Sequence, residues 1–169
     1  MNFNKSYILS GLVVILVASG FFYYEKNKSE EFRLITDETE MTKFVMTHTQ
    51  EELDEYYRKV DELKASDTYG GKTPEETLRM YIDALKAGDM ELASKYFRLE
   101  DQEKELGELV VLKEEDILKY TDLLKRSYLS KYNDIFKSHE LRVVIGEIEA
   151  SVLKIIKIEQ SGLWKLESL

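Results

Sequence analysis

The chain has 169 residues, and its 24 Lys and Arg against 33 Asp and Glu give a net charge of -9. This acidic balance argues against a nucleic-acid partner, since phosphates need a basic surface, and against a polybasic grip on anionic lipid. The absence of cysteine excludes a disulfide framework, a thiol nucleophile and a thiolate metal site.

The N-terminal region contains an uncharged hydrophobic run. After a short tail at residues 1–6, residues 7–24 read YILSGLVVILVASGFFYY. As a helix rising about 1.5 Å per residue, this run spans roughly 27 Å, close to the hydrocarbon thickness of a bilayer. Aromatic residues stand at both edges of the run, where amphipathic rings settle among lipid headgroups. We therefore expect residues 7–24 to form a transmembrane helix.

Two interpretations of this run differ in whether it stays on the protein. Small residues at Ala18-Ser19-Gly20 offer a cleavage site for a signal peptide. The run continues without a break through Phe21–Tyr24, which favours an uncleaved signal anchor. The short N-terminal tail favours a cytoplasmic N-terminus. The expected location is the cell membrane, spanned once, with the C-terminal domain outside the cytoplasm.

Residues 25–65 form a membrane-proximal segment that is expected to be partly helical. Apolar residues recur at three- and four-residue intervals, as on one face of a helix: Leu53, Tyr56, Tyr57, Val60 and Leu63. This stripe is too short to indicate a coiled coil. A stalk or self-association helix remains an alternative to a helix packed on the following domain or a spacer. Residues 66–72 contain Gly70-Gly71 and are expected to be a linker.

An α+β domain is expected at residues 73–169, beginning with a helix pair. Thr73 can cap the first helix, Pro74 suits its first position, and Glu76 completes a capping box. Gly88 supplies a left-handed stop, and Asp89 caps a second, short helix. Further helices are expected over 100–106 and 113–131. The intervening run Leu109–Leu112 fits a strand or a helix.

The last part of the chain changes to β-branched and aliphatic runs. Strands are expected at Leu141–Ile145, Val152–Ile158 and Leu163–Leu166, with Ser161-Gly162 as a hairpin turn. In the last strand, Trp164 and Leu166 should share one face, while Lys165 and Glu167 point to the other. Helices followed by strands predict an antiparallel sheet of about three C-terminal strands, with the helices packed on one side.

The stretch TPEETLRMYIDALKAGDMELASKYF, followed near the C-terminus by SGLWKLESL, carries a resemblance. It resembles the small cystatin-like or nuclear-transport-factor-like α+β domains of bacterial envelope proteins. Behind a single membrane helix, it is similar to uncharacterised single-pass membrane proteins of candidate-phylum bacteria. The resemblance covers about residues 70–169 and implies a curved sheet wrapped around an N-terminal helix. Because only three strands are clear, this chain departs from the fuller members with their deep, closed pocket.

The residue types that carry catalysis are sparse. The two histidines are His48 and His139, and the second has Asp134 and Glu140 nearby in sequence. Enzymes built on the nuclear-transport-factor-like fold often pair such groups in a cavity. The polar context of each histidine favours a solvated side chain. Acidic pairs stand in the early turns of expected helices, where the helix dipole explains them. We therefore assign no catalytic, cofactor-binding or metal-binding residue.

Aromatic residues offer the remaining candidate site. A pocket for a small apolar ligand could be lined by Tyr81, Tyr96, Phe97 and Trp164. Packing of the helix pair against the last strand explains the same residues more simply.

Three functions are compatible with the sequence. The leading hypothesis is a non-enzymatic, membrane-tethered module that presents an interaction or ligand-binding domain, with an envelope protein or a small apolar ligand as partner. The first alternative is a small hydrolase or isomerase that uses His139 with a carboxylate in a sheet cavity. The second is a subunit of an envelope complex that contacts its partners through small residues of the membrane helix, which are Gly11, Ala18, Ser19 and Gly20.

Overall fold

The computed structural model describes residues 32–167. The expected membrane helix at residues 7–24 and its small residues lie outside this range. Within the described range, no helix is both long enough and apolar enough to cross a membrane.

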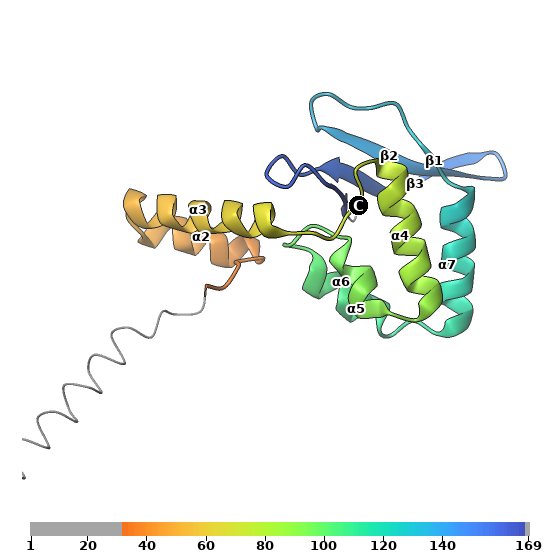
Figure 1. Ribbon diagram of the computed structural model, residues 1–169, viewed down its shortest axis with the longest axis horizontal. Coiled ribbons are helices and arrows are strands. Elements are labelled where there is room, and N and C mark those ends of the chain that lie inside the picture. The colour runs from red at the N-terminus through yellow and green to blue at the C-terminus, as the bar shows by residue number, and fades with distance from the viewer. Residues whose placement is uncertain (1–31, 168–169) are drawn as a thin grey trace, which may run out of the picture. The chain divides into compact units, whose positions relative to one another are not determined.

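The described part of the chain is α+β, with its helices first and its strands last, as the sequence predicts (Figure 1). The helices are α2 (Glu38–Thr47), α3 (Gln50–Ser66), α4 (Pro74–Ala87), α5 (Met90–Lys95), α6 (Gln102–Leu109) and α7 (Glu114–Arg126). The strands are β1 (Tyr128–Leu129), β2 (Ser138–Ile145), β3 (Ile148–Lys157) and β4 (Trp164–Glu167). They form one antiparallel sheet in the order β1-β2-β3-β4.

Helices α2 and α3 are separated by a two-residue break at His48-Thr49. Thr49 caps α3 through a reciprocal pair of bonds with Glu52, which explains why the second helix begins there. The Phe44 ring lies 4.9 Å from that of Tyr56, so the two helices pack on each other through aromatic residues. The expected apolar stripe therefore serves in part to pair α3 with α2.

The helix pair α4–α5 begins and ends where the sequence indicates. The Thr73 side chain accepts from the Glu76 amide, Pro74 is the first residue of α4, and Gly88 adopts φ +72 at its end. Asp89 caps α5. One detail differs from the expected capping box, since the Glu76 carboxylate accepts from the Lys72 amide (2.7 Å). Local signals thus determine both helix boundaries.

The expectation of three strands and of a helix over 113–131 is wrong in detail. Helix α7 ends at Arg126, and Tyr128 and Leu129 pair with Arg142 and Leu141 to form β1. Strand β3 also begins at Ile148, four residues before the expected start. A two-residue strand has no periodicity of its own, and only pairing with β2 defines it.

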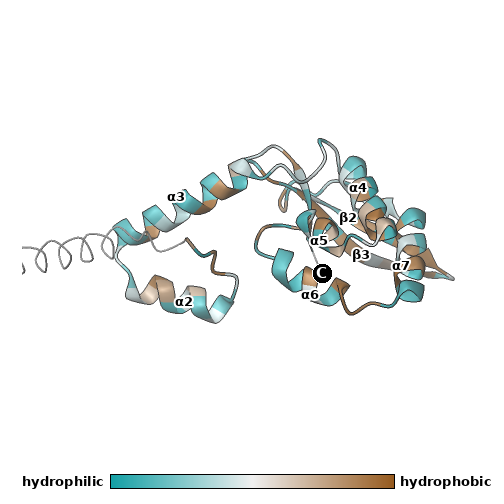
Figure 2. Cartoon of the chain, turned by 60° about the horizontal axis from the view of Figure 1, so that its bottom comes forward, coloured by the Kyte–Doolittle hydropathy of each residue, from teal (hydrophilic) through white to brown (hydrophobic). Residues whose placement is uncertain are grey.

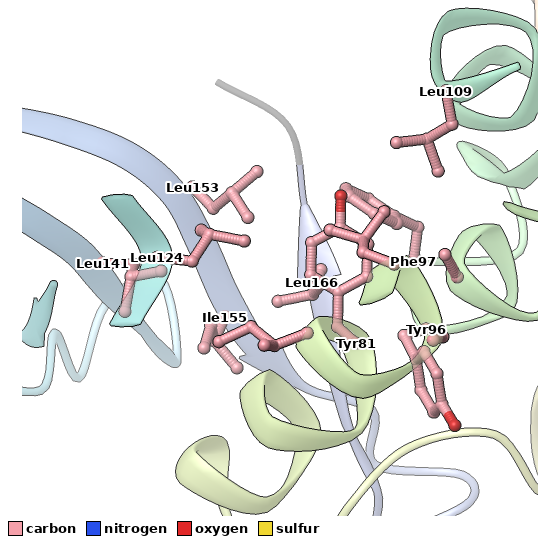
Figure 3. Close-up of a cluster of buried hydrophobic side chains, with 13 residues drawn as sticks. Tyr81, Tyr96, Phe97, Leu109, Leu124, Leu141, Leu153, Ile155 and Leu166 are labelled. Carbon is pink, nitrogen blue, oxygen red and sulfur yellow. The ribbon is translucent and has the colours of Figure 1, made fainter. Parts of the chain in front are cut away.

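Helices α4 and α7 lie along one face of the sheet, and the core lies between the two layers (Figure 1). In the close-up of this core, Tyr81, Phe97 and Leu166 lie near its centre (Figure 3). The rings of Tyr81 and Phe97 meet edge to face, with centroids 5.4 Å apart. From the sheet, the buried residues Leu141, Leu153 and Ile155 complete the cluster.

Residues 66–72, expected as a linker, pack along the edge of β4. The Trp164 amide donates to the Gly71 carbonyl oxygen (2.9 Å). A Cβ on Gly70 would lie 2.5 Å from the Trp164 carbonyl oxygen, and one on Gly71 would lie 2.6 Å from the Thr77 amide nitrogen. The two glycines therefore serve close backbone packing at this edge.

Candidate binding surface

The sheet face opposite the helices carries a polar patch on β2, β3 and β4. Alternation along β2 puts Ser138, Glu140 and Arg142 on this face, because Leu141 between them faces the core. Glu140 pairs in register with Lys154 of β3, and Lys154 pairs with Glu167 of β4. A row of alternating charges therefore crosses three strands on this face.

Ion pairs connect these charges. Arg142 donates through Nη2 to Glu140 (2.6 Å) and lies 3.5 Å from Glu149. Hydrogen bonding to Glu140 raises the pKa of Arg142 above its ordinary value. The Tyr128 hydroxyl donates to Glu149 and holds the pKa of that carboxyl below its ordinary value. The guanidinium is thus already occupied by carboxylates, whereas Lys154 lies 3.9 Å from its nearest acidic partner, Glu167.

The loop between β1 and β2 folds back beside this face. The Asn133 side chain accepts from the amides of Ile135 and Phe136 at 3.0 and 3.2 Å, which forms a tight turn. Asn133 and Ser138 bond through their main chains, and Lys137 adopts φ +49 where the loop enters β2. These bonds hold the loop against the start of the strand.

A groove of about 450 Å³ lies between this loop and the sheet. Its lining residues come from the loop and from the polar face: Ser130, Lys131, Asn133, Phe136, Ser138, Glu140, Arg142 and Lys154. The lining thus holds three cations and one carboxylate, in a chain of net charge -9. It also offers hydroxyl and amide groups and one exposed aromatic ring. We name it the sheet-face groove.

His139 lies away from this groove, on the core side of β2. Its Nδ1 is 2.8 Å from the Ser130 carbonyl oxygen, and its ring packs on Tyr132 and Trp164. Glu140, its neighbour in sequence, points to the opposite face of the sheet, and Asp134 is exposed in the loop. Among the described residues, no carboxylate lies within hydrogen-bonding distance of His139. His48 is exposed and bonds to Phe44 of its own helix (2.8 Å).

The four candidate aromatic residues belong to the core. Tyr81, Tyr96 and Phe97 are buried, and Trp164 packs part-buried against the same cluster. Trp164 also contacts Tyr132, with ring centroids 6.2 Å apart. The structure therefore brings these four residues together as packing between α4, α5 and the sheet.

Over residues 32–167, no cluster of acidic or histidine side chains has the arrangement of a metal site. No protein-family model, curated protein or solved structure matches the chain.

The sheet-face groove is the candidate that sequence reasoning missed. The polar alternation of Ser138, Glu140 and Arg142 marks the face, but nothing in the sequence indicates that the loop returns to it.

Proposed function

We propose that this protein is a non-enzymatic, membrane-tethered module that binds a partner protein through the sheet-face groove. The observation that carries this proposal is the uncovered polar face of the sheet, hollowed by the returning loop. Helices α4 and α7 pack on the other face (Figure 1), and the side chains of Glu140, Arg142 and Lys154 stay partly exposed on this one, where a partner can reach them. Its tether is the hydrophobic run at residues 7–24, and the domain is presented outside the cytoplasm.

The groove suits a polypeptide segment with acceptor groups. Lys131 and Lys154 supply cations, and Ser130 and Asn133 supply hydroxyl and amide groups. Phe136 is 72% exposed at the rim and offers an apolar anchor of the kind found at the centre of protein interfaces. An envelope protein that presents carboxylates beside an apolar residue has the chemistry that matches this lining.

Two further features support this function. The resemblance to cystatin-like and nuclear-transport-factor-like domains fits an antiparallel sheet with the α4 helix packed across one face, and that fold is part of the proposal. The surroundings of His139 favour a structural role over acid–base chemistry, because its partners are a main-chain carbonyl and two aromatic rings. The hydrolase alternative therefore receives no support from the geometry.

Photo-crosslinking in native membranes tests both parts of this proposal. The full chain carries p-benzoylphenylalanine in place of Phe136 at the groove or, as a control, in place of Leu118 on α7. Both positions are well exposed. After irradiation, the chain should remain in carbonate-washed membranes and form a discrete protein adduct from position 136 only. Release of the chain by carbonate contradicts the tether. Equal adducts from both positions, or none from position 136, contradict the binding surface.

A further inference from the structure

A second hollow lies in the helical layer, on the other side of the core from the sheet-face groove. It has a volume of about 350 Å³ and is walled by α4, α6 and α7. This volume falls within the usual range of small-molecule sites, roughly 300–1,000 Å³. Nothing in the proposed binding of a partner by the sheet uses this cavity.

The wall of this cavity is aromatic and aliphatic. Tyr120 of α7, which is partly exposed, and Tyr81 of α4, which is fully buried, line it, with ring centroids 6.4 Å apart at an interplanar angle of 79°. Burial raises the pKa of Tyr120 to about 12 and raises that of Tyr81 as well, so both phenols are neutral at ordinary pH. Leu109 and Leu112 add aliphatic surface, and the segment after α6 begins with the apolar run Val110-Val111-Leu112 (Figure 2).

The charged groups in the lining are all of one sign. Glu105, Glu108 and Asp116 line the cavity, and none of its lining residues is a cation. Glu105 is only 6% exposed, whereas Glu108 and Asp116 stand at the solvent side. Outside the lining, the exposed Lys104 lies 3.8 Å from Glu108 on the same helix. The cavity thus combines carboxylates with the partly exposed phenol ring of Tyr120 and aliphatic surface.

These properties select one class of ligand. Tyrosine faces attract a cation that comes within about 6 Å of the ring centre, and carboxylates attract the same charge. The apolar wall favours a ligand with a hydrocarbon or aromatic body, which would leave water on entry. A neutral or anionic ligand lacks the first attraction or is repelled by the carboxylates. We infer that this cavity is a binding site for an organic ammonium ion, a primary amine carried on an apolar body.

The probe is phenethylammonium, titrated calorimetrically into the full chain in lipid nanodiscs, with empty nanodiscs subtracted. The neutral comparison is 2-phenylethanol, which has the same ring and chain length. Phenethylammonium should bind saturably in the millimolar range or below, and at least about tenfold more tightly than the alcohol. Its affinity should fall as salt is raised, because the carboxylates at the solvent side are screened.

Variants then place the probe in the cavity. The double change Glu108→Gln and Asp116→Asn should lower the affinity for phenethylammonium about tenfold or more. The affinity for 2-phenylethanol should stay unchanged. The control is Glu114→Gln with Glu115→Gln, which also removes two charges, from the first turn of α7 beside Asp116 but outside the lining. The inference is overturned if phenethylammonium shows no saturable binding or binds no more tightly than the alcohol. It is also overturned if the control variant loses as much affinity for phenethylammonium as the double variant. The comparison of the two probes on the unaltered chain decides the matter even if a variant folds poorly.

Discussion

Replacing Phe97 by alanine is expected to lower the free energy of unfolding by roughly 3–5 kcal/mol. Phe97 is 0% exposed and meets Tyr81 edge to face in the centre of the core (Figure 3). Its backbone also lies beside Leu166 of β4, where the two residues form a parallel bridge. Loss of the ring removes buried apolar surface and leaves a cavity that the surrounding strands and helices can close only in part.

The matched control for this change is Phe136→Ala, the same chemical change at a side chain that is 72% exposed. Its effect should stay within about 0.5 kcal/mol, as is usual for surface positions. Urea unfolding of a fragment that spans residues 32–169, followed by circular dichroism, measures both. If both variants lose a similar amount of unfolding free energy, the assignment of Phe97 to the core and Phe136 to the surface is contradicted.

Replacing Asp67 by asparagine is expected to lower the free energy of unfolding by roughly 3–5 kcal/mol, because it breaks a buried ion pair. The Lys165 ammonium lies 2.6 Å from Asp67 Oδ2 and donates to the Lys95 carbonyl oxygen (2.6 Å). The two side chains are 1% and 5% exposed. Asparagine keeps the shape and can still accept from the Tyr69 amide, which now bonds Asp67 Oδ1 (2.9 Å). The variant therefore isolates the loss of charge.

This effect should depend on pH in a defined direction. Burial holds the pKa of Lys165 below its ordinary value of 10.5, although Asp67 opposes the shift. Without the aspartate charge, the folded state should hold the proton still more weakly than the unfolded state. Between this lowered folded-state pKa and 10.5 the unfolded state binds more protons, so stability rises with pH in that window. The difference in the free energy of unfolding between variant and parent should therefore become smaller as the pH approaches the ordinary pKa of lysine.

Asp83→Asn is the matched control, since Asp83 forms an exposed pair with Lys86 at 3.7 Å. Surface pairs of this kind contribute about 0–1 kcal/mol. The urea experiment described above compares the two changes. A loss at Asp67 no larger than that at Asp83, or a gap that does not narrow at high pH, would show that Lys165 is solvated.

Sequence patterns predicted those parts of the fold that depend on neighbours along the chain. The start of α4 at Thr73-Pro74 and its stop at Gly88 rest on capping and backbone geometry, which act within one turn. The alternation of residues along β4 also predicted that Leu166 and Lys165 lie on opposite faces of the strand. These signals are local, so the sequence carries them directly.

Long-range pairing determines the features that were missed. Lys165, expected on the face of β4 opposite Leu166, is buried, because the segment around Asp67 lies against β4 and pairs with it. The sheet-face groove arises in the same way, from a loop that folds back onto β2. Asp67 and Lys165 are far apart in the sequence, and the groove depends on the path of a loop. Periodicity within one strand records neither contact.

Lysine acylation tests the central claim, that the open face of the sheet is the binding surface. The full chain is labelled once in native membranes and once after purification, and the extent of modification at each lysine is compared by mass spectrometry. Lys131 and Lys154 line the groove, whereas Lys119 and Lys125 lie on α7 in the helical layer. The proposal predicts that labelling of Lys131 and Lys154 is severalfold lower in native membranes, with Lys119 and Lys125 unchanged. Equal labelling of all four lysines in both states, or protection confined to α7, would contradict it.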